Sequence, residues 1–211
     1  MKVCEIFASI QGESSYAGLP CVFLRMTGCN LRCSYCDSAY TYEEGSEMSE
    51  DGVVAAVLKF GLKLAEITGG EPLLQQETFP LIKRLLDLGL AVLVETNGTV
   101  SIADVDKRAV VIMDVKTPGS GMSEGLRTAN FDLLKKNDEL KFVIASRSDY
   151  EWAVNIMSSY ALAEKCPVLF SPAFNLLSPA DLSVWIIRDR LPVRFNLQLH
   201  KYIYPGEQRG V

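Results

Sequence analysis

Short apolar runs alternate with longer stretches of helical spacing along most of the chain. The apolar runs are rich in β-branched residues, which is typical of buried strands. They predict strands at Val22–Met26, Ala65–Thr68, Ala91–Glu95, Val110–Val115, Leu140–Ile144, Val168–Phe170 and Arg194–Leu199. Apolar residues spaced three or four apart predict helices at Glu50–Phe60, Thr78–Leu88, Asp149–Ala163 and Pro179–Asp189, the last with Ser178 as its N-cap. The alternation predicts an α/β fold in which helices cover a parallel sheet.

Four clusters of polar, glycine and proline residues follow directly after predicted strands. They are Gly69–Pro72, Glu95–Gly98, Asp114–Pro118 and Ser171–Phe174. Ligands of α/β proteins gather at the carboxyl ends of the strands, so four such clusters predict one shared site. Any single cluster could simply make a turn. Charged residues within or at the end of buried strands need partners or a ligand, which makes Glu95, Asp114 and Lys116 candidate site residues.

Composition limits the classes of protein that remain. The 211 residues are 48% hydrophobic and 22% charged, with a formal net charge of −5, which fits one globular domain or two very small ones. We expect a single domain over residues 1–211. No apolar run is long enough to span a bilayer, and the N-terminus lacks the apolar stretch of a signal peptide. The acidic balance argues against nucleic acid or an anionic membrane as the main partner. Pro205, Gly206 and the charged end predict a flexible tail from about residue 204.

Six cysteines and one histidine restrict the chemistry further. Disulfides would need a secreted chain, so we expect free thiols or metal ligands in a reducing cytoplasm. Cys29, Cys33 and Cys36 form a CxxxCxxC loop after Gly28, and thiolates select zinc, copper(I) or iron–sulfur clusters. A structural zinc site needs a fourth ligand that the nearby sequence does not offer. A [4Fe–4S] cluster with one open iron is therefore favoured over a zinc module or a chance cluster.

The other three cysteines lack this spacing. We expect Cys4, Cys21 and Cys166 to be buried small hydrophobic side chains.

The cysteine loop, with Tyr35 before its last cysteine, resembles the signature of the radical S-adenosylmethionine (SAM) superfamily. Gly69–Pro72 is similar to that superfamily's GGEP motif. The resemblance implies a partial (β/α)₆ barrel, distorted or trimmed in a chain this short. It also implies that SAM binds the open iron and yields a radical that abstracts a substrate hydrogen.

A narrower resemblance covers nearly the whole chain. Its motifs are similar to those of the 7-carboxy-7-deazaguanine synthase family, and they lie at Glu5–Phe7, Ile10–Glu13, Ala17–Gly18, Phe23–Arg25, Cys36–Ser38, Thr68 and Leu197–Lys201. The family implies ring contraction of 6-carboxy-5,6,7,8-tetrahydropterin to 7-carboxy-7-deazaguanine with loss of ammonia, on the route to queuosine. It further implies Mg²⁺, an electron donor such as flavodoxin or ferredoxin, and a homodimer.

The resemblance also implies roles for individual residues, with no catalytic side chain beyond the cofactors. The implied substrate contacts are Ile10, Gln11, Gly12, Glu13, Arg25 and Thr68. The implied SAM contacts are Tyr35, Cys36, Asp37, Gly70, Asp114, Val115, Lys116, Ser171, Pro172, Ala173 and Phe174. The implied metal ligands are Cys29, Cys33 and Cys36 for the cluster and Ser38 for Mg²⁺.

Several of these residues have an ordinary structural interpretation when taken alone. Arg25 would be a surface ion pair, Gln11 and Glu13 a polar loop, Ser38 a turn residue and Phe174 part of the core. His200 fits a pocket wall and a buried strand equally well.

Two other functions share part of the pattern. A radical SAM activating enzyme for a glycyl-radical protein would have the same cluster and barrel, with a pocket open to a polypeptide. A non-catalytic iron–sulfur module would have a fully ligated cluster and no SAM site.

Overall fold

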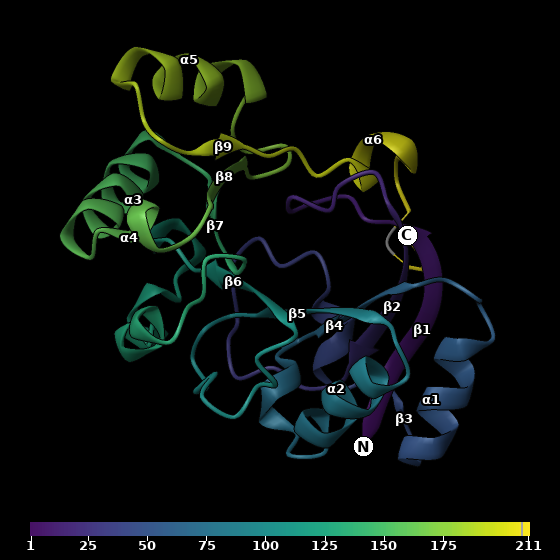
Figure 1. Ribbon diagram of the computed structural model, residues 1–211. Helices are drawn as coiled ribbons and strands as arrows, with labels where there is room; N and C mark the ends of the chain where they lie inside the picture. The colour runs from purple at the N-terminus through teal and green to yellow at the C-terminus, as the bar shows by residue number, and fades with distance from the viewer. Residues whose placement is uncertain (208) are drawn as a thin grey trace.

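The computed structural model describes residues 1–207 and 209–211, and its centre is one nine-stranded sheet (Figure 1). The strand order is β3-β1-β2-β4-β5-β6-β7-β8-β9. The strands are β1 (Lys2–Ile10), β2 (Pro20–Met26), β3 (Ser46–Glu47), β4 (Leu64–Gly69), β5 (Ala91–Thr96), β6 (Val110–Val115), β7 (Glu139–Ile144), β8 (Val168–Pro172) and β9 (Arg194–Phe195).

Every neighbouring pair from β2 to β9 is parallel, as the strand–helix alternation predicts. The sheet is open, because β3 and β9 are its edges and do not pair with each other. The predicted α/β fold with a partial barrel is confirmed. The antiparallel pairing of β1 with β2 and with β3 adds a hairpin edge that the alternation did not predict.

Helices cover the convex face and leave the other face open (Figure 1). They are α1 (Glu50–Leu58), α2 (Thr78–Asp87), α3 (Arg147–Ser159), α4 (Leu162–Lys165) and α5 (Pro179–Asp189). The short α6 (His200–Ile203) lies instead on the open side, beside the loop after β1. Ser49 caps α1 by accepting a hydrogen bond from Gly52 N, and Ser146 caps α3 through Asp149 N. Pro179 occupies the first turn of α5, although Ser178 makes no side-chain cap bond.

Two crossover connections have no α-helix, which is the trimming that the short chain implies. Residues 97–109, all described, connect β5 to β6 without one. Between β6 and β7 the chain makes only the short 3₁₀ turns Pro118–Ser120, Ser123–Gly125 and Thr128–Asp132. Further 3₁₀ turns lie at Ala39–Tyr42 and Pro72–Leu74.

Two predicted elements are shorter in the structure than the sequence predicts. The helix expected at Asp149–Ala163 ends at Ser159, because Ala161 adopts a left-handed backbone with φ of 49° and α4 begins after it. The strand expected at Arg194–Leu199 pairs only at its first two residues, and the chain then turns into α6. The spacing of the hydrophobic residues does not indicate the end of the helix or the end of the strand.

The alternation of side chains along each strand separates a core from a cavity. Val22, Leu24, Ala65 and Ile67 belong to the main core beneath the helices. On the opposite face the first positions are apolar and the later ones polar: Phe23 precedes Arg25 and Leu64 precedes Glu66 and Thr68. The carboxyl ends of the strands are therefore polar on the concave face. No helix of the described residues is long and apolar enough to cross a membrane.

Candidate active site

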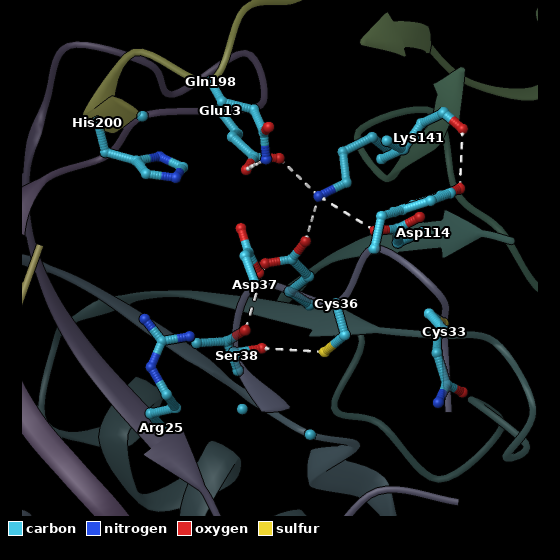
Figure 2. A pocket seen from close by; sticks show the side chains of 18 of the residues that line it. Glu13, Arg25, Cys33, Cys36, Asp37, Ser38, Asp114, Lys141, Gln198 and His200 are labelled. Carbon is cyan, nitrogen blue, oxygen red and sulfur yellow. Dashed lines mark hydrogen bonds and ion pairs between the residues drawn. The ribbon is translucent and has the colours of Figure 1, made fainter. Parts of the chain in front are cut away.

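A cavity of about 700 Å³ opens over the carboxyl ends of the strands. Its wall is built from the loop after β1, the cysteine loop, the ends of strands β2, β4, β5, β6 and β7, and the C-terminal segment. Figure 2 shows Cys33 and Cys36 on one side of this cavity and Glu13 and His200 on the other. The clusters predicted after separate strands therefore meet at one place.

Most of the predicted site residues line this cavity. They are Ile10, Gln11, Gly12, Glu13, Arg25, Thr68, Tyr35, Cys36, Asp37, Gly70, Asp114, Lys116, Ala173, Phe174, Cys29, Cys33 and Ser38. Three predicted SAM contacts do not. Val115 is one position out of phase with Asp114 and packs into the core beneath the helices, while Ser171 is fully buried and pairs with Asn196. Pro172 lines a smaller neighbouring pocket. Phe174 is 44% exposed at the cavity and not part of the core.

The three cysteines of the loop are half-buried free thiols in the cavity wall. The sulfur of Cys29 accepts hydrogen bonds from Leu31 N at 3.4 Å and from Asn97 Nδ2 at 3.8 Å. Burial raises the pKa of Cys29 and Cys33, so a bound metal centre would have to displace their protons. Cys21 and Cys166 are buried elsewhere as predicted, whereas Cys4 is only half-buried.

The loop after β4 packs tightly against the cysteine loop. A side chain on Gly70 would place its Cβ 2.7 Å from Cys29 Cβ, which only glycine avoids. Glu71 fixes the loop by accepting hydrogen bonds from Leu73 N, Thr96 Oγ1 and Asn97 N. The GGEP motif thus builds the floor beneath the thiols.

The side chains of the cavity wall are of the kinds that an iron–sulfur cluster and SAM require. Three thiols on one loop, with N–H donors to sulfur, suit an iron–sulfur cluster. Among residues 1–207 and 209–211, no three His, Cys, Asp or Glu side chains converge to hold a single metal ion. Asp114 Oδ1 is buried in the cavity wall and has no hydrogen-bond partner among the described residues, so it can accept a hydrogen bond from a polar ligand such as SAM. Ser38 offers one hydroxyl to the cavity, 3.9 Å from Cys36 Sγ, and a hydroxyl oxygen is the kind of donor that a hard cation accepts.

Lys141 on β7 is the centre of a buried charge cluster (Figure 2). Its Nζ contacts Glu13 at 2.6 Å, Asp114 at 3.4 Å and, more closely, Glu95. Burial opposes the charge, but these carboxylates outweigh it and raise the pKa of Lys141 well above its ordinary value. Lys116 in turn pairs with Asp114 at 2.8 Å. Glu95, Asp114 and Lys116 thus have the charged partners that their burial requires.

Arg25 is held on the wall by two neighbours. Its Nε donates to Glu5 Oε1 at 2.7 Å, and Tyr40 donates its hydroxyl to the same oxygen at 2.8 Å. The guanidinium also lies over the ring of Phe7, with Cζ 5.5 Å from the centroid. The pair is largely buried at the cavity, so a simple surface ion pair is excluded.

His200 lies in the cavity wall at the start of α6, not in a strand. Leu199 N donates to Gly12 O at 2.8 Å, and a Cβ on Gly12 would lie 2.9 Å from His200 N, so glycine permits this contact. Burial lowers the pKa of His200 although Glu13 opposes the shift. Beyond α6, Arg209 pairs with Glu44 at 2.7 Å and Val211 lines the cavity. The flexible tail stays a prediction.

Glu66 and Lys141 line the cavity but were not predicted from the sequence, and they contribute a hydrogen bond and charge there. Asn97 lies in the predicted cluster Glu95–Gly98 and donates to Cys29, while Glu5 lies outside the cavity lining and holds Arg25. For Glu66 and Lys141 a signal existed, because each is a lone charge within an apolar strand and lies two positions from another cavity residue.

Comparisons with known proteins agree with this geometry. The model of the radical SAM superfamily matches residues 23–157. The 7-carboxy-7-deazaguanine synthase of Koribacter versatilis is 46% identical over 226 aligned residues that cover all of both chains. That of Chlorobaculum tepidum is also 46% identical and is covered over 97% of its length.

The chain belongs to the 7-carboxy-7-deazaguanine synthase family of radical SAM enzymes. Membership in this family implies a [4Fe–4S] cluster and SAM, which agrees with the thiols in the cavity wall. The crystal structure of QueE from Escherichia coli has the same fold, with a TM-score of 0.78 at 20% identity over 94% of each chain. Membership does not favour the activating enzyme or the passive iron–sulfur module.

Proposed function

We propose that the chain converts 6-carboxy-5,6,7,8-tetrahydropterin to 7-carboxy-7-deazaguanine with release of ammonia, a step toward queuosine and related 7-deazapurines. The observation that carries the proposal is full-length similarity to enzymes of that name, together with one cavity that joins three thiols to a polar, charge-paired wall. The cavity is of the size that holds small-molecule ligands.

In this proposal one side of the cavity holds the cluster and SAM, and the opposite side holds the substrate. Bound cluster and SAM would supply the radical that abstracts a substrate hydrogen. Cys29, Cys33 and Cys36 hold the cluster, while Gly70 offers its backbone to the methionyl part of SAM. Asp114 Oδ1 supports this assignment, because it is a buried acceptor without a partner among the described residues.

The substrate would lie on the opposite side, against the loop Ile10–Glu13 and Thr68. Arg25 would hold its carboxylate through a two-pronged hydrogen bond from the terminal guanidinium nitrogens, because Glu5 occupies Nε. Ser38, next to Asp37 in the cysteine loop, would give its hydroxyl to a Mg²⁺ ion whose other ligands are substrate and water oxygens.

The partners of the reaction are part of the same proposal. The cluster would receive its electron from a flavodoxin or a ferredoxin, and the protein would work as a homodimer in the cytoplasm. Six free cysteines are compatible with a reducing compartment.

The test is anaerobic reconstitution of the cluster, reduction and incubation with SAM and the carboxytetrahydropterin. We expect 7-carboxy-7-deazaguanine and ammonia, detected by mass spectrometry and an ammonia assay. SAM cleavage without this product would indicate another radical SAM reaction. An iron–sulfur spectrum that does not change on addition of SAM would instead favour a passive module.

Replacing Arg25 with alanine should weaken substrate binding far more than SAM binding. A buried charge-assisted hydrogen-bond pair contributes about 1.5–3 kcal/mol, so the Kd for the pterin should rise by about 10- to 100-fold. Calorimetry on the reconstituted protein measures both ligands. The matched control is Arg108→Ala, an arginine that makes exposed ion pairs with Asp87 and Asp106 and does not line the cavity. Equal losses for pterin and SAM in Arg25→Ala would contradict the role.

A further inference from the structure

A carboxyl group without a role in the proposed chemistry is buried behind the cavity wall. Glu66 on β4 is 2% exposed and reaches the cavity beside Gln11 and Glu95. Its Oε2 accepts a short hydrogen bond from Gln11 Nε2. Glu95 is on the neighbouring strand β5 and lines the same cavity, so its carboxyl group faces that of Glu66. Two carboxyl groups can share a hydrogen bond only if one of them carries a proton.

The charges around Glu66 do not supply an alternative partner. Glu13 and Glu95 face it from the loop after β1 and from β5, and the thiol of Cys21 faces it from β2. Lys141 is the nearby cation, but its ammonium already contacts Glu13, Glu95 and Asp114. Burial and the repulsion from Glu95 both disfavour the ionised form, and the pKa of Glu66 lies well above its ordinary value.

We propose that Glu66 carries a proton in the folded protein and is a positioning residue that donates a hydrogen bond to Glu95 and accepts one from Gln11. The oxygens of Glu95 then accept from Lys141 and, at 3.2 Å, from Thr68 Oγ1. Gln11 in turn accepts from Glu13 N at 2.8 Å, so its amide is fully oriented. One proton thus holds both the Ile10–Glu13 loop and the β5 wall in place.

This inference also revises how Gln11 acts. Both ends of its amide are occupied within the protein, by Glu66 and by the backbone of Glu13. Gln11 is therefore oriented by the protein, and its amide can still offer a ligand its second N–H and the second lone pair of its oxygen. Only the identity of the ligand rests on the proposed function.

A proton on Glu66 predicts the direction in which the stability of the protein changes with pH. A glutamate in the unfolded chain ionises near a pH of about 4.3, whereas the folded chain retains the proton on Glu66. Folding then takes up a proton above that pH, and the free energy of unfolding falls as the pH rises. Glu66→Gln keeps the same hydrogen bonds, since its amide oxygen can accept from Gln11 and its nitrogen can donate to Glu95, but it does not titrate. Its Tm relative to the wild type should therefore increase from a pH of about 4.5 to about 8.

The experiment has a stability arm and a binding arm. Thermal unfolding across this pH range compares the wild type with Glu66→Gln and with Glu77→Gln, which removes an exposed carboxylate and should show no such trend. The second arm measures the Kd of the reconstituted holoprotein for carboxytetrahydropterin and for SAM, without reductant. We expect Glu66→Gln to stay within about threefold of the wild type and Glu66→Leu to lose about tenfold or more for the pterin only.

The outcomes separate this inference from the proposed function. A Tm deficit of Glu66→Gln that deepens with pH, or a difference that does not change with pH, would overturn the protonated state. Equal loss of pterin affinity in Glu66→Gln and Glu66→Leu would overturn the positioning role. If Glu66→Leu does not fold, the pH series of Glu66→Gln decides alone. If the wild type binds no pterin, the proposed function fails while the stability arm still decides the state of Glu66.

Discussion

Alanine at Cys29, Cys33 or Cys36 should abolish both the iron–sulfur cluster and the reaction. The three thiols share one loop in the cavity wall, so each removal takes away one of three protein ligands with no nearby cysteine to replace it. The remaining cysteines lie in β1, in β2 and before β8. Iron and sulfide analysis after anaerobic reconstitution, with absorption spectra, measures the cluster, and SAM cleavage measures the consequence. We expect cleavage to fall below detection in all three variants.

The matched controls are Cys4→Ala, Cys21→Ala and Cys166→Ala, which should keep their iron. Cys21 and Cys166 are buried, so their loss removes packing and should cost about 1–2 kcal/mol of stability without changing the cluster. Iron retention in all six variants would refute the assignment, as would loss of iron from a control that remains folded.

Sequence patterns predicted the parts of the fold that depend on local periodicity. Five of the apolar runs became the strands β4 to β8, because a strand buried on both faces is apolar throughout. Strands β1 and β3, which pair antiparallel at one side of the sheet, were not among the predicted strands, since partly exposed strands mix polar and apolar residues. The break at Ala161 was missed for a different reason: it depends on one left-handed residue that the hydrophobic spacing passes over.

The candidate site was predictable where a motif or a resemblance named it. The cysteine loop and the GGEP motif are local in sequence, and their close packing in space follows from the adjacency of β2 and β4. Glu66 and Lys141 were not named, because their roles depend on which strand faces which. The alternation along each strand nonetheless indicates which face a residue lies on. Glu66 lies two positions before Thr68 and so shares its face, whereas Val115 lies one position after Asp114 and so lies on the opposite face. Pairings such as Arg25 with Glu5 depend on the tertiary structure.

Removing the charge at Lys141 should be the most damaging single change outside the cysteine loop. Lys141→Met keeps the length of the side chain but leaves Glu13, Glu95 and Asp114 near one another without their shared cation. Breaking a buried ion pair in this way costs about 3–5 kcal/mol. We therefore expect a large loss of Tm and a rise of about 100-fold or more in the Kd for the pterin, because Glu13 would move or take up a proton and Glu95 would lose its partner.

The pH dependence of this loss follows from the pKa shifts of the carboxylates. Although burial opposes the shift, Lys141 lowers the pKa of Glu13, and Lys116 with Lys141 lowers that of Asp114. In the wild type these groups contribute stability above a pH of about 4, which is lost as the pH falls through their folded pKa values. Without Lys141 the same carboxyl groups favour protonation, so the Tm deficit of the variant should widen as the pH rises.

Thermal unfolding of Lys141→Met between pH about 4.5 and 8 checks this expectation against Lys83→Met. Lys83 pairs with Asp87 at 2.7 Å in an exposed i,i+4 arrangement, which contributes little to stability. Its removal should leave Tm and pterin affinity nearly unchanged. A Tm deficit of Lys141→Met that narrows as the pH rises would mean that the three carboxylates do not depend on Lys141. The charge cluster would then be a consequence of the fold and not a condition for holding the cavity wall in place.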